Sequence, residues 1–186
     1  MTVEAILDGA IRVLEQEGSL ALTTTRIAQA AGVSVGTLYQ YFPHRKSILD
    51  SLQERELERT MCLMHQVMVD SPPGSTDELA RAVIHGLFTL YGAAPELHRV
   101  LVIEGLTGAA PEQVKAFDLR MVSMVRSVLA SAKLSCRRKN LDAAAFVAYQ
   151  SVRASMMAHL LEAPPGLDEG ALTDELADLL HRYLVA

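Results

Sequence analysis

Three cations of this chain lie in a stretch that contains no acidic residue. No Asp or Glu occurs from Gly18 through Leu49, and the stretch includes Arg26, Arg45 and Lys46. The whole chain, by contrast, carries a formal net charge of -5 at pH 7. Cationic and hydroxyl side chains without neighbouring carboxylates favour contact with phosphate. We therefore expect this stretch to form a local phosphate-binding surface, of the kind that a small DNA-binding head presents.

The same stretch predicts a helix, a tight turn and a second helix. A threonine hydroxyl near Thr24 suits a helix start, and Gly32 suits a helix end because glycine tolerates the left-handed conformation. A short helix is expected over residues 35–41, since the chain before Pro43 avoids the helical region. Short side chains at the tip of such a helix allow it to enter the major groove. Gly36 costs roughly 1 kcal/mol of helix propensity, and either close approach to DNA or close helix packing would explain it.

Helical patterns continue through the rest of the chain, and no stretch alternates apolar and polar residues long enough to form a strand. The expected fold is all-α, with about nine helices. Residues 1–47 are expected to form a three-helix head that contains the helix-turn-helix, and residues 48–186 a second helical domain. Caps, prolines and glycines place the later helices at residues 45–69, 75–93, 95–106, 112–134, 142–162 and 168–184.

The composition limits the setting of the protein. Half of the residues are hydrophobic, so a core can form, and the sequence pI of about 5.7 restricts any DNA contact to a local surface. Cys62 and Cys136 are far apart and form no CxxC motif, which fits a reducing cytoplasm. The acidic, amphipathic amino end is no signal peptide. No apolar run approaches the ~20 residues that span a bilayer, so we expect a cytoplasmic protein without a membrane partner.

Enzyme chemistry finds little support in the sequence. The six histidines are scattered without HxxxH or HExxH spacing, and no GxSxG, P-loop or GxGxxG motif occurs. We therefore expect no catalytic residue, no metal and no cofactor. Cys136 precedes Arg137, Arg138 and Lys139. These cations could lower the pKa of its thiol, as in a redox sensor, but complementing a helix C-terminus is the favoured interpretation.

The segment GTLYQYF at residues 36–42, with a basic residue two positions after Pro43, is a specific motif. It resembles the TetR family of transcriptional repressors. The matching residues, in the order and spacing of the family, are Thr23-Thr24, Ile27-Ala28, Ala31-Gly32-Val33-Ser34, Gly36-Thr37-Leu38-Tyr39, Tyr41-Phe42 and Arg45. The resemblance covers the head; beyond it, only the helix count and the opening Pro95-Glu96-Leu97 are similar.

The resemblance implies two kinds of DNA contact. The residues that match backbone-contacting positions are Thr24, Ser34, Tyr39, Tyr41 and Arg45. The residues that match positions facing bases, or lying beside them, are Thr25, Val35, Gly36, Thr37 and Gln40. Arg26 and Lys46 stand where acidic residues are common in the family, and both are expected to add positive charge to the DNA face.

The resemblance also implies a helical dimer module. One stripe of small residues, which would let another helix come close, comprises Ala144, Val147, Ser151, Ala154 and Ala158. The final helix carries Leu172, Leu176, Leu179, Tyr183 and Leu184. Two such helices from each chain would make a four-helix interface; alternatively, both stripes pack inside one chain. The dimer is favoured because one recognition helix reads few base pairs, whereas a twofold dimer reads half-sites ~34 Å apart.

A ligand cavity is the other property that the resemblance implies. Methionine side chains adapt to irregular shapes and suit a pocket for an apolar ligand, although for any single methionine ordinary core packing is the favoured interpretation. Glu104, in the apolar run LVIEGL, is the first candidate for a polar anchor, and each polar candidate could instead form a core salt bridge or lie at the dimer seam. The candidate ligand-binding residues are Met61, Met64, Met68, Phe88, Tyr91, Glu104, Phe117, Met121, Met124, Phe146, Gln150, Arg153 and Met157.

The sequence therefore predicts a ligand-responsive transcriptional regulator. It is expected to repress by binding a palindromic double-stranded DNA operator as a homodimer, and to be released by a small-molecule effector. Two alternatives stay open. One is a constitutive DNA-binding protein without an effector, and the other is a helical enzyme or partner-binding module.

Overall fold

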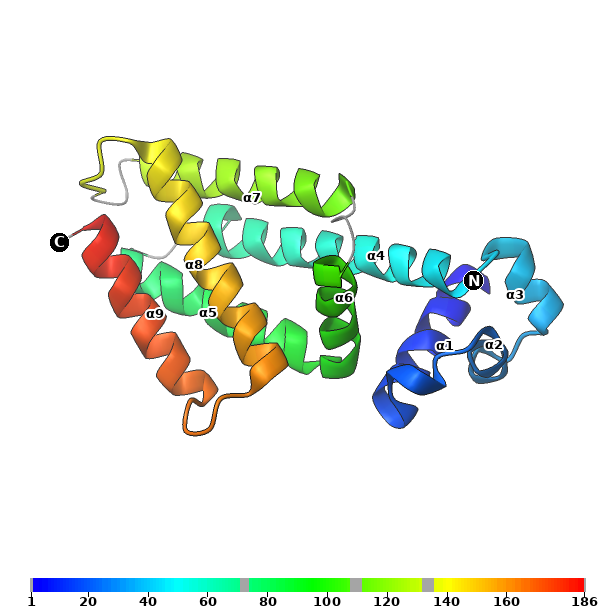
Figure 1. Ribbon diagram of the computed structural model, residues 1–186. Helices are drawn as coiled ribbons and strands as arrows, with labels where there is room; N and C mark the ends of the chain where they lie inside the picture. The colour runs from blue at the N-terminus through cyan, green and yellow to red at the C-terminus, as the bar shows by residue number, and fades with distance from the viewer. Residues whose placement is uncertain (1, 71–73, 108–111, 132–135, 186) are drawn as a thin grey trace. The chain divides into compact units, whose positions relative to one another are not determined.

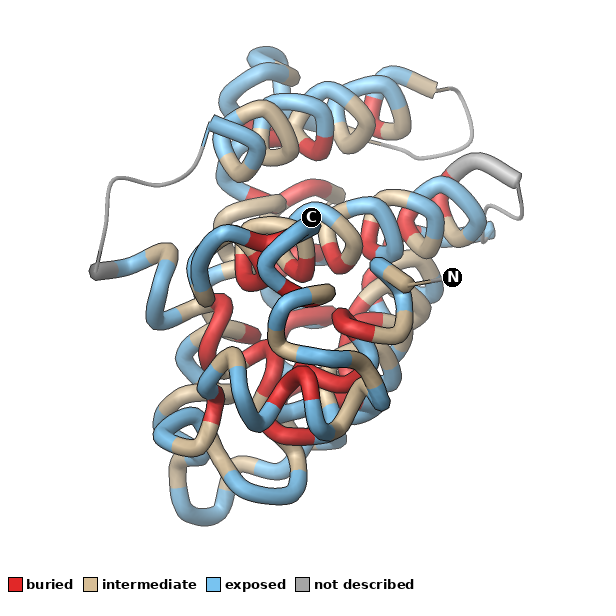
Figure 2. The backbone as a smooth tube through the Cα atoms, turned by 90° about the vertical axis from the view of Figure 1, so that its right-hand side faces the viewer, coloured by how far each residue is buried: buried red, intermediate tan, exposed pale blue. Residues whose placement is uncertain are grey.

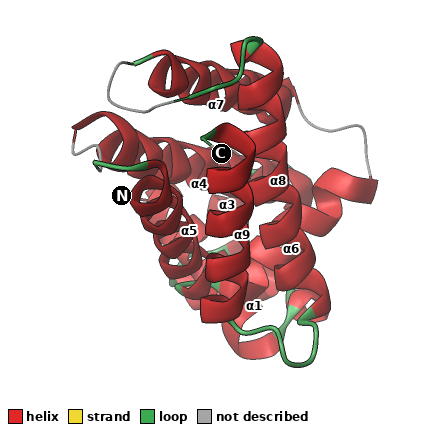
Figure 3. Ribbon diagram, turned by 90° about the vertical axis from the view of Figure 1, so that its left-hand side faces the viewer, coloured by secondary structure: helices red, strands yellow, loops and turns green. Residues whose placement is uncertain are grey.

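A computed structural model describes residues 2–70, 74–107, 112–131 and 136–185 of the chain. Within these residues it shows nine α-helices and no strand, which confirms the all-α expectation (Figures 1 and 3). The helices are α1 (Thr2–Glu17), α2 (Thr24–Ala31), α3 (Val35–Tyr41), α4 (Arg45–His65), α5 (Thr76–Gly92), α6 (Pro95–Thr107), α7 (Glu112–Ala130), α8 (Leu141–Glu162) and α9 (Glu169–Leu184).

The chain divides into two compact units that interleave in the sequence. The first consists of Met1–Glu58 with Tyr91–Ala109, and the second of Arg59–Leu90 with Ala110–Ala186. The helix-turn-helix therefore shares its unit with α6, a helix from much later in the chain. In both units, buried residues recur along each helix between exposed ones, as expected for amphipathic helices (Figure 2).

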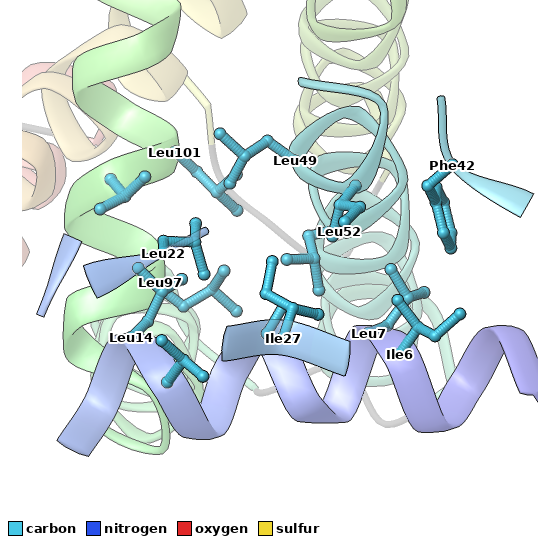
Figure 4. Close-up of a cluster of buried hydrophobic side chains, with 14 of the residues drawn as sticks. Ile6, Leu7, Leu14, Leu22, Ile27, Phe42, Leu49, Leu52, Leu97 and Leu101 are labelled. Carbon is cyan, nitrogen blue, oxygen red and sulfur yellow. The ribbon is translucent and has the colours of Figure 1, made fainter. Parts of the chain in front are cut away.

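The first unit is built on one apolar core (Figure 4). Leu14 of α1, Ile27 of α2 and Leu38 of α3 are each completely buried in it. The start of α4 adds Leu52, and α6 adds Leu97, also completely buried. Four helices from the amino end and one from later in the sequence thus bury their apolar faces against one another, which fixes the position of the two helices of the helix-turn-helix.

α1 packs closely against α2 at Gly9. A Cβ atom added at Gly9 would lie 2.9 Å from the backbone nitrogen of Ala31 and 3.0 Å from its Cβ. Only glycine leaves room for that approach. The side chain of Arg12 donates a hydrogen bond to the carbonyl oxygen of Ala30 at 2.6 Å, which ties α1 to the end of α2.

Local signals place the ends of the short helices. Gly18 and Gly32 adopt positive φ angles of 81° and 69°, and Gly32 is the left-handed cap of α2 that the sequence predicts. The hydroxyl of Thr23, rather than that of Thr24, accepts from the backbone N–H of Arg26 at 3.3 Å and caps α2. A 3-10 helix at Ser19–Ala21, which the sequence did not predict, joins α1 to α2.

The long helix changes its geometry before its end. α4 is an α-helix over Arg45–His65 and continues as a π-helix over Gln66–Asp70, so the helix expected to residue 69 is present, with a π-helical last turn that the sequence did not predict. The proline-rich break at residues 71–73 lies outside the described residues. α7 begins at Glu112 as predicted and ends at Ala130, before the expected residue 134. α6 begins at Pro95 as predicted.

A carboxylate from α1 caps the start of α6. Glu15 accepts hydrogen bonds from the backbone N–H of Leu97 at 2.9 Å and of Glu96 at 3.4 Å. The first N–H groups of a helix have no partner within the helix, and an anion is stabilised there. Glu15 thus anchors the amino end of α6 to the helix-turn-helix head.

In the second unit, side-chain caps define the later helices. The hydroxyl of Ser75 accepts from the backbone N–H of Glu78 at 3.1 Å, and the Glu78 carboxylate accepts from the backbone N–H of Gly74 at 2.9 Å. Asn140 and Asp168 cap α8 and α9 in the same way. These caps confirm the starts expected near residues 142 and 168.

The basic run after Cys136 covers the end of α9. The backbone N–H of Arg137 donates to the carbonyl oxygen of Leu184 at 2.8 Å. Arg138 donates from Nε to the carbonyl oxygen of Tyr183, and its guanidinium lies 4.3 Å from the centre of that ring. Cations stabilise the carbonyl end of a helix, so the geometry matches the interpretation that the sequence favoured over a redox sensor.

Candidate nucleic-acid interface

The recognition helix of the helix-turn-helix, α3, has one buried and one exposed face. Leu38 is completely buried, and Phe42, just after the helix, is 5 % exposed. Tyr39 and Tyr41 are half-exposed, at 50 % and 49 %, and Gln40 is exposed as well. The buried residues hold the helix on the core, so its polar face is free to meet a ligand.

Hydroxyl groups at the start of α3 are held in place by one another. Ser34 caps the helix by accepting from the backbone N–H of Thr37 at 2.9 Å, and the two hydroxyl oxygens lie 2.8 Å apart. The hydroxyls of Thr24 on α2 and Tyr39 on α3 lie 3.0 Å apart. All four residues are predicted to contact DNA, and the pair of Thr24 and Tyr39 joins α2 to α3 across the turn. Fixed hydroxyls of this kind are common donors to phosphate oxygens.

Gly36 lies on the exposed side of α3. A Cβ atom at this position would meet nothing closer than Ser34 Oγ at 3.7 Å. Packing against another helix of this chain therefore does not require the glycine. Of the two explanations that the sequence left open, the described structure favours an approach by something outside the chain. Val35 and Thr37 beside it are half-buried, and Thr25 is exposed.

Each cation of the acid-free stretch has a carboxylate partner. Arg26 donates from Nε to Glu17 at 3.0 Å, and Lys46 donates to Asp50 at 2.7 Å. The hydrogen bond from Lys46 to Asp50, and then the charge of Asp50, raise the pKa of Lys46 above its ordinary value. The charge that these two residues were expected to add to the DNA face is therefore offset by neighbouring acids.

The third cation pairs with α6. Arg45 Nη1 lies 3.7 Å from Glu104 Oε1, and the two side chains are 39 % and 47 % exposed. Glu104, the first candidate for a ligand anchor, is thus an exposed partner of a predicted phosphate-binding arginine; its ligand role stays a prediction. Of the three carboxylate partners, Glu17, Asp50 and Glu104, only Asp50 could be predicted from the sequence, since it stands four residues after Lys46 on one helix.

The predicted ligand-binding residues divide between the two units. Tyr91 and Glu104 belong to the first unit and the other eleven to the second, so neither unit contains the whole set. Phe146 is 53 % exposed. The side chains of the set that are buried are Met64, Met68, Phe88 and Met121, and those of intermediate exposure are Met61, Tyr91, Phe117, Met124, Gln150, Arg153 and Met157.

Arg153 takes part in a polar cluster between α7 and α8. Its Nε lies 3.3 Å from an oxygen of Asp118, and the hydroxyl of Tyr149 donates to the same carboxylate at 2.5 Å. Neither Asp118 nor Tyr149 was singled out from the sequence. Nothing local marks them, because they meet only when α7 packs on α8.

The predicted dimer stripes are partly used inside the chain. Ala144 of α8 and Leu172, Leu176 and Leu184 of α9 are buried, so the alternative of packing within one chain holds for these four. Val147, Ala154, Ala158 and Leu179 are exposed.

An open groove of about 680 Å³ lies along α9. Its lining residues are Ser155 of α8 and, from α9, Leu172, Glu175, Leu176, Asp178, Leu179, Arg182 and Tyr183. Of the exposed stripe residues, Leu179 lines this groove.

In the described residues, no three His, Cys, Asp or Glu side chains come together in a way that could hold a metal ion. None of the helices in the described ranges has the length and apolar character needed to cross a membrane.

Comparison with known proteins identifies the class of this helix-turn-helix chain. Residues 6–52 match the sequence profile of bacterial regulatory proteins of the tetR family. Residues 75–184 match that of the tetracyclin repressor-like carboxyl-terminal domain. The chain belongs to the tetR family of bacterial regulatory proteins, which confirms the resemblance and the expectation of a regulator rather than an enzyme.

Curated relatives match part of the chain. The nucleoid occlusion factor SlmA of Vibrio campbellii is 31 % identical over 99 residues, which are 53 % of this chain and 50 % of SlmA. SlmA of Haemophilus ducreyi is 41 % identical over 59 residues, 31 % of this chain and 29 % of that protein. The chain therefore spans half or less of the length of these relatives.

Solved structures match the fold over nearly the whole chain. The regulator FadR from Bacillus subtilis, in complex with stearoyl-CoA, superposes with a TM-score of 0.74 at 20 % identity, covering 97 % of this chain and 98 % of that one. FadR from Thermus thermophilus, in complex with lauroyl-CoA, superposes with a TM-score of 0.67 at 19 % identity, covering 99 % and 95 %. At this identity the likeness concerns the fold.

Proposed function

We propose that this protein is a transcriptional repressor that binds a palindromic DNA operator in the cytoplasm. The observation that carries the proposal is the polar face of α3. Gly36 is open to solvent, Tyr39 and Tyr41 are half-exposed, and a fixed hydroxyl pair lies at the helix start. Gly36 and Gln40, four residues apart on this face, would lie along the floor of a major groove.

The contacts are proposed to divide by chemistry. Tyr39, Tyr41 and Arg45, with the hydroxyls of Thr24 and Ser34, would bind phosphate oxygens and set the register on the duplex. The residues proposed to face or flank bases are Thr25, Val35, Gly36, Thr37 and Gln40.

The test is selection of bound fragments from genomic DNA with the purified protein at low salt. The expected product is a palindrome with half-sites about one helical turn apart. Gly36→Glu serves as the control, because it adds a carboxylate to the exposed face without touching the core. Failure of the wild-type protein to retain any duplex at low salt would overturn the proposal.

A homodimer is proposed to present the two heads. Val147, Ala154 and Ala158 form an exposed face of small side chains on α8, and Leu179 of α9 is 45 % exposed beside the groove. Small residues allow a second copy of these helices to approach closely. Ala154→Glu is expected to give a monomer in analytical ultracentrifugation, whereas Ser123→Glu on the exposed side of α7 is expected to leave the dimer intact.

A small apolar molecule is proposed to release the protein from DNA. Buried Met64, Met68 and Met121, with Phe88, give the second unit an adaptable apolar interior. α4 begins at Arg45 in the first unit and extends into the second. A ligand that binds better to a state with displaced α4 helices would change the spacing of the two heads and lower their affinity for DNA.

The acyl-CoA ligands of the two FadR structures suggest the first compounds to test. We expect lauroyl-CoA or stearoyl-CoA to raise the melting temperature and to weaken operator binding, with free CoA as the control for the apolar chain. The second candidate function is DNA binding without an effector. An operator affinity that no acyl chain or other apolar ligand changes would favour it.

A further inference from the structure

Three carboxylates from outside the acid-free stretch of residues 18–49 form ion pairs with its cations. Glu17 stands directly before the stretch and Asp50 directly after it. Glu104 comes from α6, far along the chain. Together they pair with Arg26, Lys46 and Arg45, which are all the lysines and arginines of the stretch.

The pair between Arg45 and Glu104 differs from the other two. Its nearest nitrogen and oxygen are 3.7 Å apart, which exceeds the length of an ordinary N–H···O hydrogen bond of about 2.7–3.2 Å. Both side chains are more than a third exposed. An ion pair without a directed hydrogen bond, and open to water, exchanges its partner readily. A phosphate oxygen could therefore replace the carboxylate.

Glu104 acts on both cations at the start of α4. Besides pairing with Arg45, its negative charge makes a smaller contribution to the raised pKa of Lys46, after the hydrogen bond and charge of Asp50. The carboxylate is thus directed at the site where DNA phosphate is proposed to lie, and a phosphate that approaches Arg45 also approaches Glu104.

Resting on the DNA-binding function proposed above, we propose that Glu104 is an intramolecular competitor of DNA phosphate for Arg45. The negative charge from α6 lowers the affinity of each head for every duplex. Because Glu104 is carried by α6, displacement of this helix changes the charge that the head presents to DNA, even when the two recognition helices keep their spacing.

The amino-terminal half of α6 is fixed to the head, whereas Glu104 lies in the other half. Glu15 caps the helix start, and His98 is buried, with Nε2 3.6 Å from Glu56 Oε2 on α4. Glu104, in contrast, is exposed and follows Leu101, which is buried in the core of the head. Among the described residues, its ion pair with the head is the long one to Arg45. The carboxyl-terminal half of α6 is therefore the part whose movement would break this competition.

The experiment compares Glu104→Gln with the wild-type protein in binding to a labelled duplex of arbitrary sequence. Non-specific duplex is a suitable probe because its binding is almost wholly electrostatic. Glu96→Gln is the matched control: it removes the same charge from the same helix, and Glu96 pairs with Arg99 at the same 3.7 Å, with similar exposure. Circular dichroism establishes that both variants keep their helices.

We expect Glu104→Gln to bind duplex about two- to fivefold more tightly per head at low salt, the size expected for an exposed ion pair. The difference should shrink at high salt because the charge is screened. Glu96→Gln should bind like the wild-type protein. When Arg45 has already been replaced by alanine, Glu104→Gln should raise the duplex affinity clearly less than it does in the wild-type protein.

Two results would overturn the inference while leaving the proposed function standing. The first is that the wild-type protein binds duplex, but Glu104→Gln raises its affinity no more than Glu96→Gln does. The other is a gain from Glu104→Gln that is equally large when Arg45 is replaced by alanine. If neither the wild-type protein nor Glu104→Gln bound duplex at low salt, the proposed function and this inference would both be wrong.

Discussion

Replacement of Gly9 by alanine tests the packing of the helix-turn-helix head. The added Cβ would lie 2.9 Å from the backbone nitrogen of Ala31 and 3.1 Å from its Cα. Backbone atoms cannot turn aside as the tip of a flexible side chain can. α1 and α2 would therefore have to separate by several tenths of an ångström, which disturbs the contacts of Ile27 in the core.

The expected size follows from two opposing effects. Overpacking in a core costs about 1–3 kcal/mol, and glycine-to-alanine replacement inside a helix returns about 1 kcal/mol through helix propensity. Because the clash is with backbone, we expect the cost to lie in the upper part of its range. The free energy of unfolding of Gly9→Ala should then fall by about 1–2 kcal/mol.

Gly36→Ala is the matched comparison, since its Cβ would meet only Ser34 Oγ at 3.7 Å. This variant should be more stable than the wild-type protein, by up to about 1 kcal/mol of helix propensity. Urea unfolding followed by circular dichroism measures both variants under the same conditions. If Gly9→Ala proved as stable as Gly36→Ala, the close approach of α1 and α2 would not be a property of the folded head, and the reasoning would be refuted.

Four further substitutions test the interface and its support. Arg45→Ala should weaken binding to all duplexes alike and reduce the dependence of log affinity on log salt concentration by about 1 per head. Tyr41→Phe should also weaken binding to all duplexes alike. If either variant preferred a different sequence, the assignment of that residue to phosphate would be wrong. Gly36→Glu should abolish DNA binding while circular dichroism and sedimentation show the wild-type fold and dimer, and unfolding of this variant would mean that the glycine serves packing. Glu15→Ala should lower stability by about 1–2 kcal/mol by removing the cap of α6, and an unchanged melting temperature would argue against the cap.

The helix boundaries of the head were readable from the sequence because local chemistry sets them. Gly32 adopts the left-handed conformation that its residue type predicts, and the hydroxyl of Ser34 caps the next helix. Pro95 and Asn140 mark helix starts in the same way. Each of these signals acts within one turn of the chain, so it needs no knowledge of the tertiary structure.

The partners of Arg26 and Arg45 could not be read in this way, unlike Asp50, which stands four residues after Lys46. Arg26 meets Glu17 across the turn between α1 and α2, and Arg45 meets Glu104 only because α6 packs on the head. The apolar run around Glu104 suggested an interior position, yet its side chain is 47 % exposed. Burial on a helix depends on which neighbours arrive from elsewhere in the chain, and that information is not local.

The participation of α6 in the core of the head has a consequence for chimeric regulators. Leu97 is completely buried among residues of the helix-turn-helix, and Val100 and Leu101 belong to the same cluster. A head transplanted as its amino-terminal segment alone would leave this apolar surface open to water. A hybrid that joins this DNA specificity to another sensory body should therefore carry residues 91–109 along with residues 1–58, at the cost of three junctions instead of one.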